Sequence, residues 1–137
     1  FCVVRGRNAC QGRAVADELP KEGGRVINVS ALGSTRPMPG ISVYSASKAA
    51  LNALTRVWAM ELGPRGVTVN AVSPGPVETD MFRAAATEDV AKYLISRTPL
   101  GRIGMPDDIA GVIAFLASSD GRWVTGEVIA VSGGCNP

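Results

Sequence analysis

Hydrophobic residues follow two different spacings along the chain. Short apolar runs rich in β-branched residues, at 25–30 (RVINVS), 67–72 (VTVNAV) and 127–131 (EVIAV), predict strands. Longer segments at 42–62 and 106–118, with apolar residues three and four positions apart, predict helices. Strands that alternate with helices in this order predict an α/β fold in which helices flank a parallel sheet.

Further segments complete this outline. A short apolar run at 2–4 predicts another strand, and residues 12–19 (GRAVADEL) predict the helix after it. Residues 80–96 predict a mobile helical segment. The chain has 137 residues, which suits one compact domain, so we expect a single unit over 1–137 with about four strands.

The long helix predicted at 42–62 carries two apolar stripes. Two stripes predict burial on two sides, one against the sheet and one against a second helix, for example from another subunit. A single broad side that faces the core explains the pattern equally well. Tyr44, Lys48 and Thr55 fall on the remaining, more polar side. The first stripe consists of Val43, Ala46, Ala50, Ala53, Val57 and Met60, and the second of Leu51, Leu54, Trp58 and Leu62.

Composition argues against several classes of protein. The sequence is 46% hydrophobic and 19% charged, as in globular proteins and unlike disordered ones. The net charge is +2 without a basic stripe, so we expect no nucleic-acid partner. Apolar runs such as 109–117 are too short for a bilayer, and we see no secretory signal. We therefore expect a cytoplasmic protein without a membrane partner.

The side chains available for chemistry are limited. Cys2, Cys10 and Cys135 are odd in number and far apart, which indicates free thiols and argues against a disulfide framework or a zinc site. The sequence contains no histidine, so we expect no histidine-dependent nucleophile and no metal centre. Proton transfer near neutral pH then requires a carboxylate, a lysine, a cysteine or a tyrosine with a shifted pKa.

The stretch SVYSASKAAL contains a candidate proton-transfer pair. Tyr44 and Lys48 stand four residues apart, on one side of the predicted helix. A free tyrosine has a pKa of about 10, and a nearby ammonium group favours the phenolate. Lowering that pKa by about three units requires about 4 kcal/mol, which the lysine and a cationic cofactor ring could supply together. The spacing alone, however, favours an ordinary solvated helix surface.

The ends of the predicted strands place further polar groups near this pair. Ser30 ends the first of these strands, and a Ser-Pro-Gly-Pro turn at 73–76 follows the next. Ligands of parallel α/β sheets bind at the carboxyl ends of the strands. The backbone of this turn and the Thr79 hydroxyl could bind an amide or a phosphate. Thr79 could also simply cap the following helix, and both roles are compatible.

One series of motifs runs through residues 25–134 in a fixed order. It consists of RVINVS, YSASK, LGPRGVTVNAVSPGPVETDM, PLGRIGMPDDIAGVIAFLAS and VTGEVIAVSGG. Here the sequence resembles the C-terminal half of the short-chain dehydrogenase/reductase family. The resemblance implies an incomplete Rossmann-type fold, an NAD or NADP cofactor, and hydride transfer between an alcohol and a carbonyl of a small-molecule substrate. We also expect a homodimer or homotetramer.

The resemblance implies roles for individual residues. Tyr44 is the expected general acid and base. Lys48 is expected to lower the pKa of Tyr44 and to hold the nicotinamide ribose, and Ser30 to hydrogen-bond the substrate oxygen. Segment 80–97 is the expected substrate lid. The residues expected around the nicotinamide are Pro74, Gly75, Val77 and Thr79.

Residues 1–24 resemble the family's first strand, glycine-rich turn and first helix in a degenerate form. Gly6 and Gly12 match two glycines of the turn, which let the backbone approach a pyrophosphate, whereas Cys10 replaces the middle glycine. An alternative alignment places RGRNACQ in the helix before the strand that ends at Ser30. We favour the first alignment because GRAVADEL fits the family's first helix better.

Two departures from the family bear on activity. Between Glu22 and Arg25 the chain passes from the first helix to the strand of Ser30. A central segment is therefore expected to be missing, including the catalytic Asn and the residue that selects NAD or NADP. The family's serine stands thirteen residues before the tyrosine, where this chain has Ala31, while Ser30 stands fourteen before. We favour Ser30 because its S-x-x-G spacing is kept.

Two hypotheses about function remain open. The first is an NAD(P)-dependent oxidoreductase that uses Tyr44 as its acid and base. The second is a truncated, catalytically weak relative that acts through oligomerisation. The second gains support from the missing segment, because removal of central strands leaves a sheet edge that needs a new partner.

Overall fold

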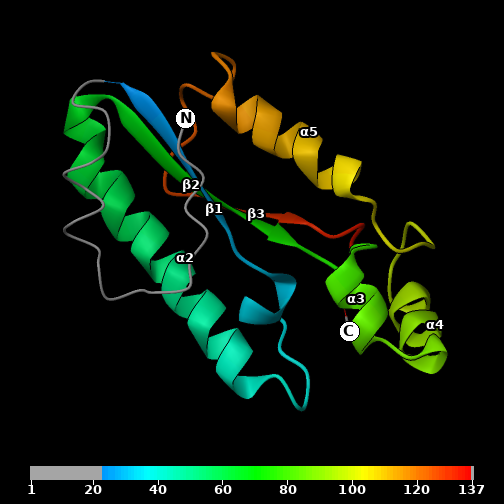
Figure 1. Ribbon diagram of the computed structural model, residues 1–137. Helices are drawn as coiled ribbons and strands as arrows, with labels where there is room; N and C mark the ends of the chain where they lie inside the picture. Colours follow the sequence, from blue (N-terminus) through cyan, green and yellow to red (C-terminus); the bar gives the residue numbers. More distant parts are fainter. Residues whose placement is uncertain (1–22, 137) are drawn as a thin grey trace.

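A computed structural model describes residues 23–136, in which a sheet lies between helices (Figure 1). The predicted α/β fold with a parallel sheet is confirmed. The strand expected at 2–4 and the helix expected at 12–19 lie outside the described residues. The strands are β1 (Gly24–Val29), β2 (Val67–Pro74) and β3 (Val128–Val131), all parallel and in the order β1-β2-β3.

The helices agree with the predicted segments, with one difference. The predicted mobile segment at 80–96 forms two helices, because the Thr87 side chain accepts a hydrogen bond from Val90 N and so begins a new helix. The α-helices are α2 (Ser42–Leu62), α3 (Asp80–Ala85), α4 (Glu88–Ser96) and α5 (Pro106–Ala117), and the short 3-10 helices are η2 (Leu32–Ser34) and η3 (Gly63–Arg65).

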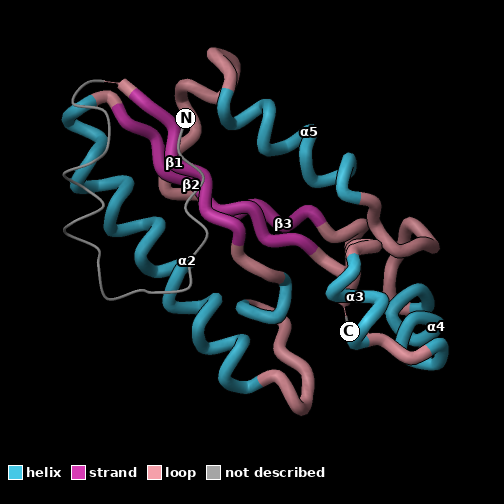
Figure 2. Tube along the Cα trace, in the orientation of Figure 1, coloured by secondary structure: helices cyan, strands magenta, loops and turns pink. Residues whose placement is uncertain are grey.

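The connections place helices on both faces of the sheet. Helix α2 connects β1 to β2 and covers one face, while α5 covers the other (Figure 2). Alternate residues of a strand point to opposite faces. Val26 accordingly packs with Trp58 of α2, and Ile27 packs with Leu116 of α5. Each fully buried side chain of this size contributes about 1.5–3 kcal/mol, so β1 is anchored on both faces.

Described residues bury only one of the two apolar stripes predicted on α2. Leu51, Trp58 and Leu62 of the second stripe are buried against the sheet. The first stripe is exposed, with Val43 at 83% and Met60 at 72%. Trp123, between α5 and β3, is also exposed, at 96%.

The prediction that Thr55 lies on the polar side of α2 is wrong. Thr55 is 0% exposed, and its hydroxyl accepts a hydrogen bond from Asn28 Nδ2 at 2.9 Å. The same hydroxyl donates to Leu51 O at 2.8 Å. The apolar pattern of the helix could not show this, because the polar partner of Thr55 lies in β1.

In residues 23–136 no helix is long and apolar enough to cross a membrane.

Candidate active site

The carboxyl ends of the three strands meet at one edge of the sheet. There Gly75 N donates to Val131 O at 3.0 Å, which joins the turn after β2 to the end of β3. A Cβ atom at Gly75 would lie 2.8 Å from Ser132 Cα, closer than packed side chains allow. Glycine is therefore required at this point because two backbones pass each other closely.

The structure brings Tyr44 and Lys48 together at this edge. Both lie in the first two turns of α2, and Lys48 Nζ lies 5.9 Å from the centroid of the Tyr44 ring, a cation–π distance. Lys48 Nζ also donates to Val29 O at 2.9 Å, which fixes the ammonium at the end of β1. An ammonium group has three N–H donors, so two remain for a ligand.

Burial moves the pKa values of this pair toward the neutral forms. It raises the pKa of the Tyr44 phenol and lowers the pKa of the Lys48 ammonium, since a partly dry environment disfavours either charge. The chain by itself therefore does not show the lowering of the Tyr44 pKa that was expected from Lys48. A further positive charge is needed to favour the phenolate.

The Ser30 hydroxyl does not face the same way as the pair. Ser30 is 3% exposed, and its Oγ donates to Lys48 O at 3.4 Å, within α2. Ala31, the next residue, lines a pocket at this edge of the sheet. The contact between Ser30 and a substrate oxygen stays a prediction, and the hydroxyl in its present orientation supports the backbone of α2 instead.

The turn after β2 positions the residues expected around the nicotinamide. Val77 forms a β-bridge with Gly104, and Thr79 Oγ1 accepts from Phe82 N at 3.2 Å. The capping role considered for Thr79 is thus present. The Thr79 O–H group donates to no residue in the described part of the chain, so it is available to a ligand.

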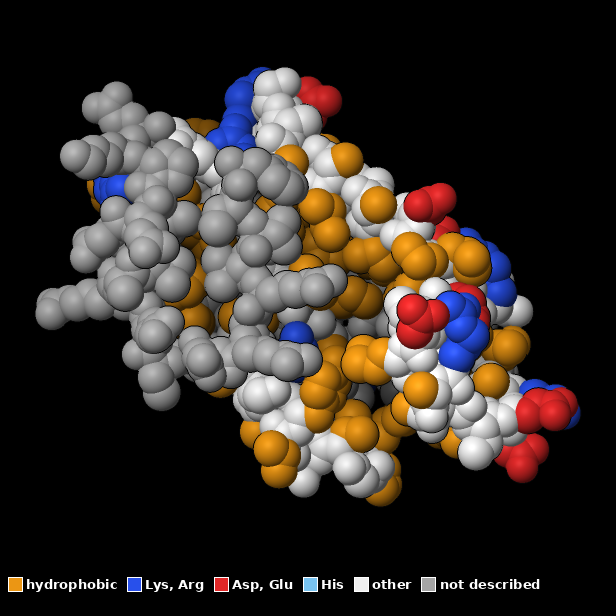
Figure 3. Space-filling view, viewed as in Figure 1, with side chains coloured by type: hydrophobic (Ala, Val, Ile, Leu, Met, Phe, Trp, Pro, Cys, Tyr) orange, Lys and Arg blue, Asp and Glu red, His pale blue; other side chains and the backbone are white. Residues whose placement is uncertain are grey.

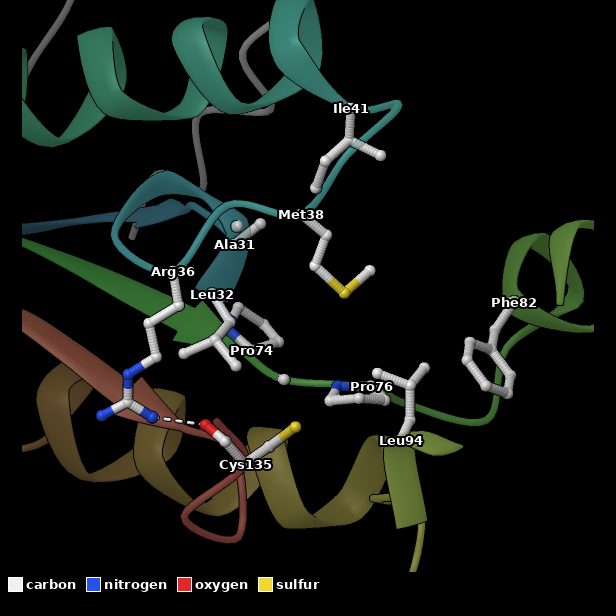
Figure 4. Close-up of a pocket in the computed structure, with 12 residues that line it drawn as sticks. Ala31, Leu32, Arg36, Met38, Ile41, Pro74, Pro76, Phe82, Leu94 and Cys135 are labelled. Atoms are coloured by element: carbon white, nitrogen blue, oxygen red, sulfur yellow. Dashed lines mark hydrogen bonds between the residues drawn. The ribbon is translucent and has the colours of Figure 1, made fainter. Parts of the chain in front are cut away.

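An apolar pocket of about 180 Å³ opens beside these strand ends. Phe82 and Leu94 reach it from the predicted lid segment, and Cys135 reaches it from the C-terminal end of the described chain (Figure 4). The space-filling view shows hydrophobic side chains around a hollow beside α3 (Figure 3). The pocket is lined by Ala31, Leu32, Gly33, Arg36, Met38, Ile41, Pro74, Gly75, Pro76, Phe82, Leu94 and Cys135.

The sequence pattern points to some of the residues that shape this pocket and not to others. Pro74, Gly75 and the lid segment were predicted at the site, whereas Met38 was given no role and Cys135 was treated only as one of three thiols. Cys135 is fully buried and belongs to a cluster with Leu32 and Leu94. The available signal was the alternation of Pro and apolar residues in 37–41, which directly precedes the helix of Tyr44.

The described residues fit the nicotinamide end of a dinucleotide cofactor. Lys48 has two unused N–H donors and Thr79 one unused hydroxyl, and both stand at the strand ends. Gly6 and Gly12, expected at the pyrophosphate, lie outside the described residues. Between residues 23 and 136 no group of three or more Cys, Asp or Glu side chains could hold a metal ion.

Comparison with known proteins identifies the lineage. A family profile described as enoyl-(acyl carrier protein) reductase matches residues 6–136. A short-chain type dehydrogenase/reductase of Picea abies is 40% identical over 130 residues, which cover 95% of this chain and 48% of that protein. The chain belongs to the short-chain dehydrogenase/reductase family. The family profile, the relative of Picea abies and the fold all confirm the resemblance seen in the motifs at 25–134.

Two solved structures share the fold of this chain. A blue fluorescent protein from a metagenomic library, in complex with NADPH, is 44% identical with a TM-score of 0.80, over 89% of this chain and 49% of that one. A 7α-hydroxysteroid dehydrogenase complexed with NADH and 7-oxo glycochenodeoxycholic acid is 33% identical with a TM-score of 0.84. The match covers 90% of this chain and 49% of that one. The chain spans about half the length of the relatives it matches.

Proposed function

We propose that this short-chain dehydrogenase/reductase transfers hydride between an alcohol and a carbonyl, with NAD or NADP as its cofactor. The observation that carries the proposal is the Tyr44–Lys48 pair, fixed at the end of β1 by the bond from Lys48 Nζ to Val29 O. NADPH and NADH in the two similar structures support a nicotinamide cofactor.

In the proposed reaction Tyr44 exchanges a proton with the substrate oxygen. During reduction the phenol gives its proton to the oxygen as the carbonyl carbon gains hydride, and during oxidation the phenolate removes the hydroxyl proton. A bound nicotinamide supplies or accepts the hydride. Lys48 would hold the nicotinamide ribose with its free N–H donors, and its charge together with that of the oxidised ring would favour the phenolate.

The remaining assignments are also proposals, and those of Gly6 and Gly12 rest on the resemblance of the sequence alone. Pro74, Gly75, Val77 and Thr79 are proposed to surround the nicotinamide, and Gly6 and Gly12 to approach the pyrophosphate. Ser30 is proposed as a donor to the substrate oxygen after a change of rotamer. The small-molecule substrate, the cytoplasmic location, and the lack of nucleic-acid and membrane partners stay predictions from the sequence.

Titration calorimetry with NADH and NADPH tests the cofactor, and Tyr44→Phe tests the acid. We expect binding at millimolar concentration or below. Tyr44→Phe should lower kcat by about 10²–10⁴-fold, the usual contribution of a general acid, while the cofactor Kd changes little. Trp123→Phe is the control, because Trp123 is an exposed aromatic residue outside both the pocket and the lid segment.

Each result has a clear meaning. No binding of either cofactor at millimolar concentration would exclude catalysis by this chain. Turnover retained in Tyr44→Phe would refute the role of the phenol. For Ser30→Ala, a loss of kcat/KM close to that of Tyr44→Phe supports the substrate contact, whereas a near-normal value shows that Ser30 only supports α2.

A second candidate function is association by a catalytically weak relative. Two observations favour it: the first stripe of α2 is exposed, and β1 pairs with β2 alone among the strands of residues 23–136. Exposed apolar stripes and unpaired strand edges both favour contacts between chains. We propose a homodimer or homotetramer formed through these surfaces.

A further inference from the structure

We propose that the pocket at the strand ends selects an uncharged, apolar carbonyl compound, or its alcohol, with a body about the size of one six-membered ring. The inference rests on the proposed hydride transfer and adds the class of substrate. It is carried by the chemistry and the volume of the pocket.

The side chains that line the pocket offer almost only carbon and sulfur to a ligand. Met38 and Phe82 approach it from different sides, and Leu32, Ile41 and Leu94 complete the apolar wall (Figure 4). The lining contains no carboxylate and no side-chain amide among the described residues. A substrate rich in hydroxyl groups would lose its hydration here without gaining hydrogen bonds.

Arg36 is the one charged side chain among the described residues of this lining, and one of its N–H groups is already bonded within the chain. Its Nη1 donates to the carbonyl oxygen of Cys135, so the guanidinium is held against the C-terminal end of the described chain (Figure 4). Cys135 is itself fully buried with Leu32 and Leu94, which fixes this partner in place. A substrate carboxylate held against the apolar wall would lose its hydration without a partner, and only one that reached the other N–H groups of Arg36 would be paired.

The volume sets the size of the substrate body. The pocket measures about 180 Å³. An engineered apolar cavity of about 150 Å³ is large enough to bind benzene, whereas pockets for drug-sized ligands begin at about 300 Å³. One aromatic or alicyclic ring with a short side chain therefore fits, and a fused-ring compound would extend beyond the pocket.

The polar end of such a substrate is expected at Tyr44. Ala31 lines the pocket with a methyl group, and the Ser30 hydroxyl is bonded to Lys48 O. Tyr44 is 41% exposed in the first turn of α2, directly after the pocket residue Ile41 and Ser42–Val43. The carbonyl would face the phenol while the ring enters the pocket.

Ligand-observed NMR on the cofactor-free protein tests the selectivity with two matched ketones. Acetophenone and phenylglyoxylate share the ring and the ketone, but only phenylglyoxylate carries a carboxylate. We expect acetophenone to bind at least tenfold more tightly. Met38→Asp should weaken the binding of acetophenone at least tenfold, because it places a carboxylate in the apolar wall. Met38→Leu, which keeps the wall apolar, should retain the binding. Met60→Asp is the control, since Met60 is exposed on α2 outside the pocket.

The outcomes separate the substrate class from the reaction. Equal or tighter binding of phenylglyoxylate, no binding of acetophenone, or acetophenone binding unchanged in Met38→Asp would overturn the proposed class. Met38-dependent binding of acetophenone in a chain that binds neither NADH nor NADPH would support the apolar selectivity and would overturn the hydride transfer.

Discussion

Single residues at the strand ends decide whether this site can move a proton. The Tyr44 phenol and the Lys48 ammonium lie close together, yet burial favours the neutral form of each. In the proposed reaction, burial alone would make the pair a better proton donor, in a reduction, than a proton acceptor. A bound oxidised nicotinamide ring carries the positive charge that would reverse this preference.

Titration of the phenol tests this charge balance. The difference in phenolate absorbance between the protein and Tyr44→Phe should give a Tyr44 pKa above the ordinary 10.0 without cofactor, because burial raises it. Lys48→Met should raise this pKa further, since it removes the nearby positive charge, and added NAD should lower it. A midpoint below 10.0 in the free protein would contradict the effect of burial.

The raised Tyr44 pKa also determines how the stability of the fold changes with pH. The folded chain holds the Tyr44 proton more tightly than the unfolded chain, so the stabilisation from Tyr44 is complete below the unfolded pKa and is lost as pH rises through the folded pKa. In the proposed reaction, carbonyl reduction, which would need the phenol, should decline as pH rises through the Tyr44 pKa of the cofactor complex, while alcohol oxidation should increase.

Secondary-structure elements were largely predictable from the sequence, and their side-chain directions were less so. The bounds of α2 match the prediction at Ser42 and Leu62, because Gly63-Pro64 stops the helix. The burial of Thr55 was not predictable, because it depends on Asn28 in another element. The orientation of Ser30 likewise depends on the neighbouring backbone of α2, and spacing within one segment cannot reveal it.

The turn between β2 and α3 gives a prediction at the scale of elements. Gly75→Ala places a methyl group 2.8 Å from Ser132 Cα and should separate the ends of β2 and β3. We expect the free energy of unfolding, measured in urea, to fall by about 1–3 kcal/mol, as in other overpacked sites. The affinity for the cofactor should also fall, because Gly75 belongs to the turn that is proposed to surround the nicotinamide.

Gly111→Ala is the matched control for this substitution. Gly111 lies within α5, and no atom lies within 4 Å of a Cβ built there. The control should raise the free energy of unfolding by about 0.5–1 kcal/mol, because alanine favours helices over glycine. Equal effects of the two substitutions would show that the close contact at Gly75 does not affect the free energy of unfolding.

At the scale of the whole molecule, residues 23–136 form a sheet of three strands with an exposed α2 stripe on one side. The pattern of strands and helices predicted this parallel arrangement. The pocket could not be predicted, because it joins the loop after β1, the helices α3 and α4 and the C-terminal end, with Arg36 and Cys135 separated by 99 positions.

Association of the whole molecule can be measured through its thermal stability. If chains associate through α2, Tm should rise with protein concentration, because association stabilises only the folded state. Val57→Lys, in the exposed stripe, should remove this dependence and shift the sedimentation coefficient toward the monomer. Trp123→Lys should change neither, as it alters an equally apolar exposed site elsewhere. A Tm independent of concentration would contradict the proposed association.

The contrasting positions of the two tryptophans have a practical consequence. Trp58 is 5% exposed between α2 and the sheet, while Trp123 is 96% exposed. Their indole rings should therefore emit at different wavelengths, the buried one toward the blue and the solvated one toward the red. Replacing Trp123 with Phe would leave Trp58 as the single tryptophan, and a shift of its emission toward the red would report directly on the separation of α2 from the strands beneath it.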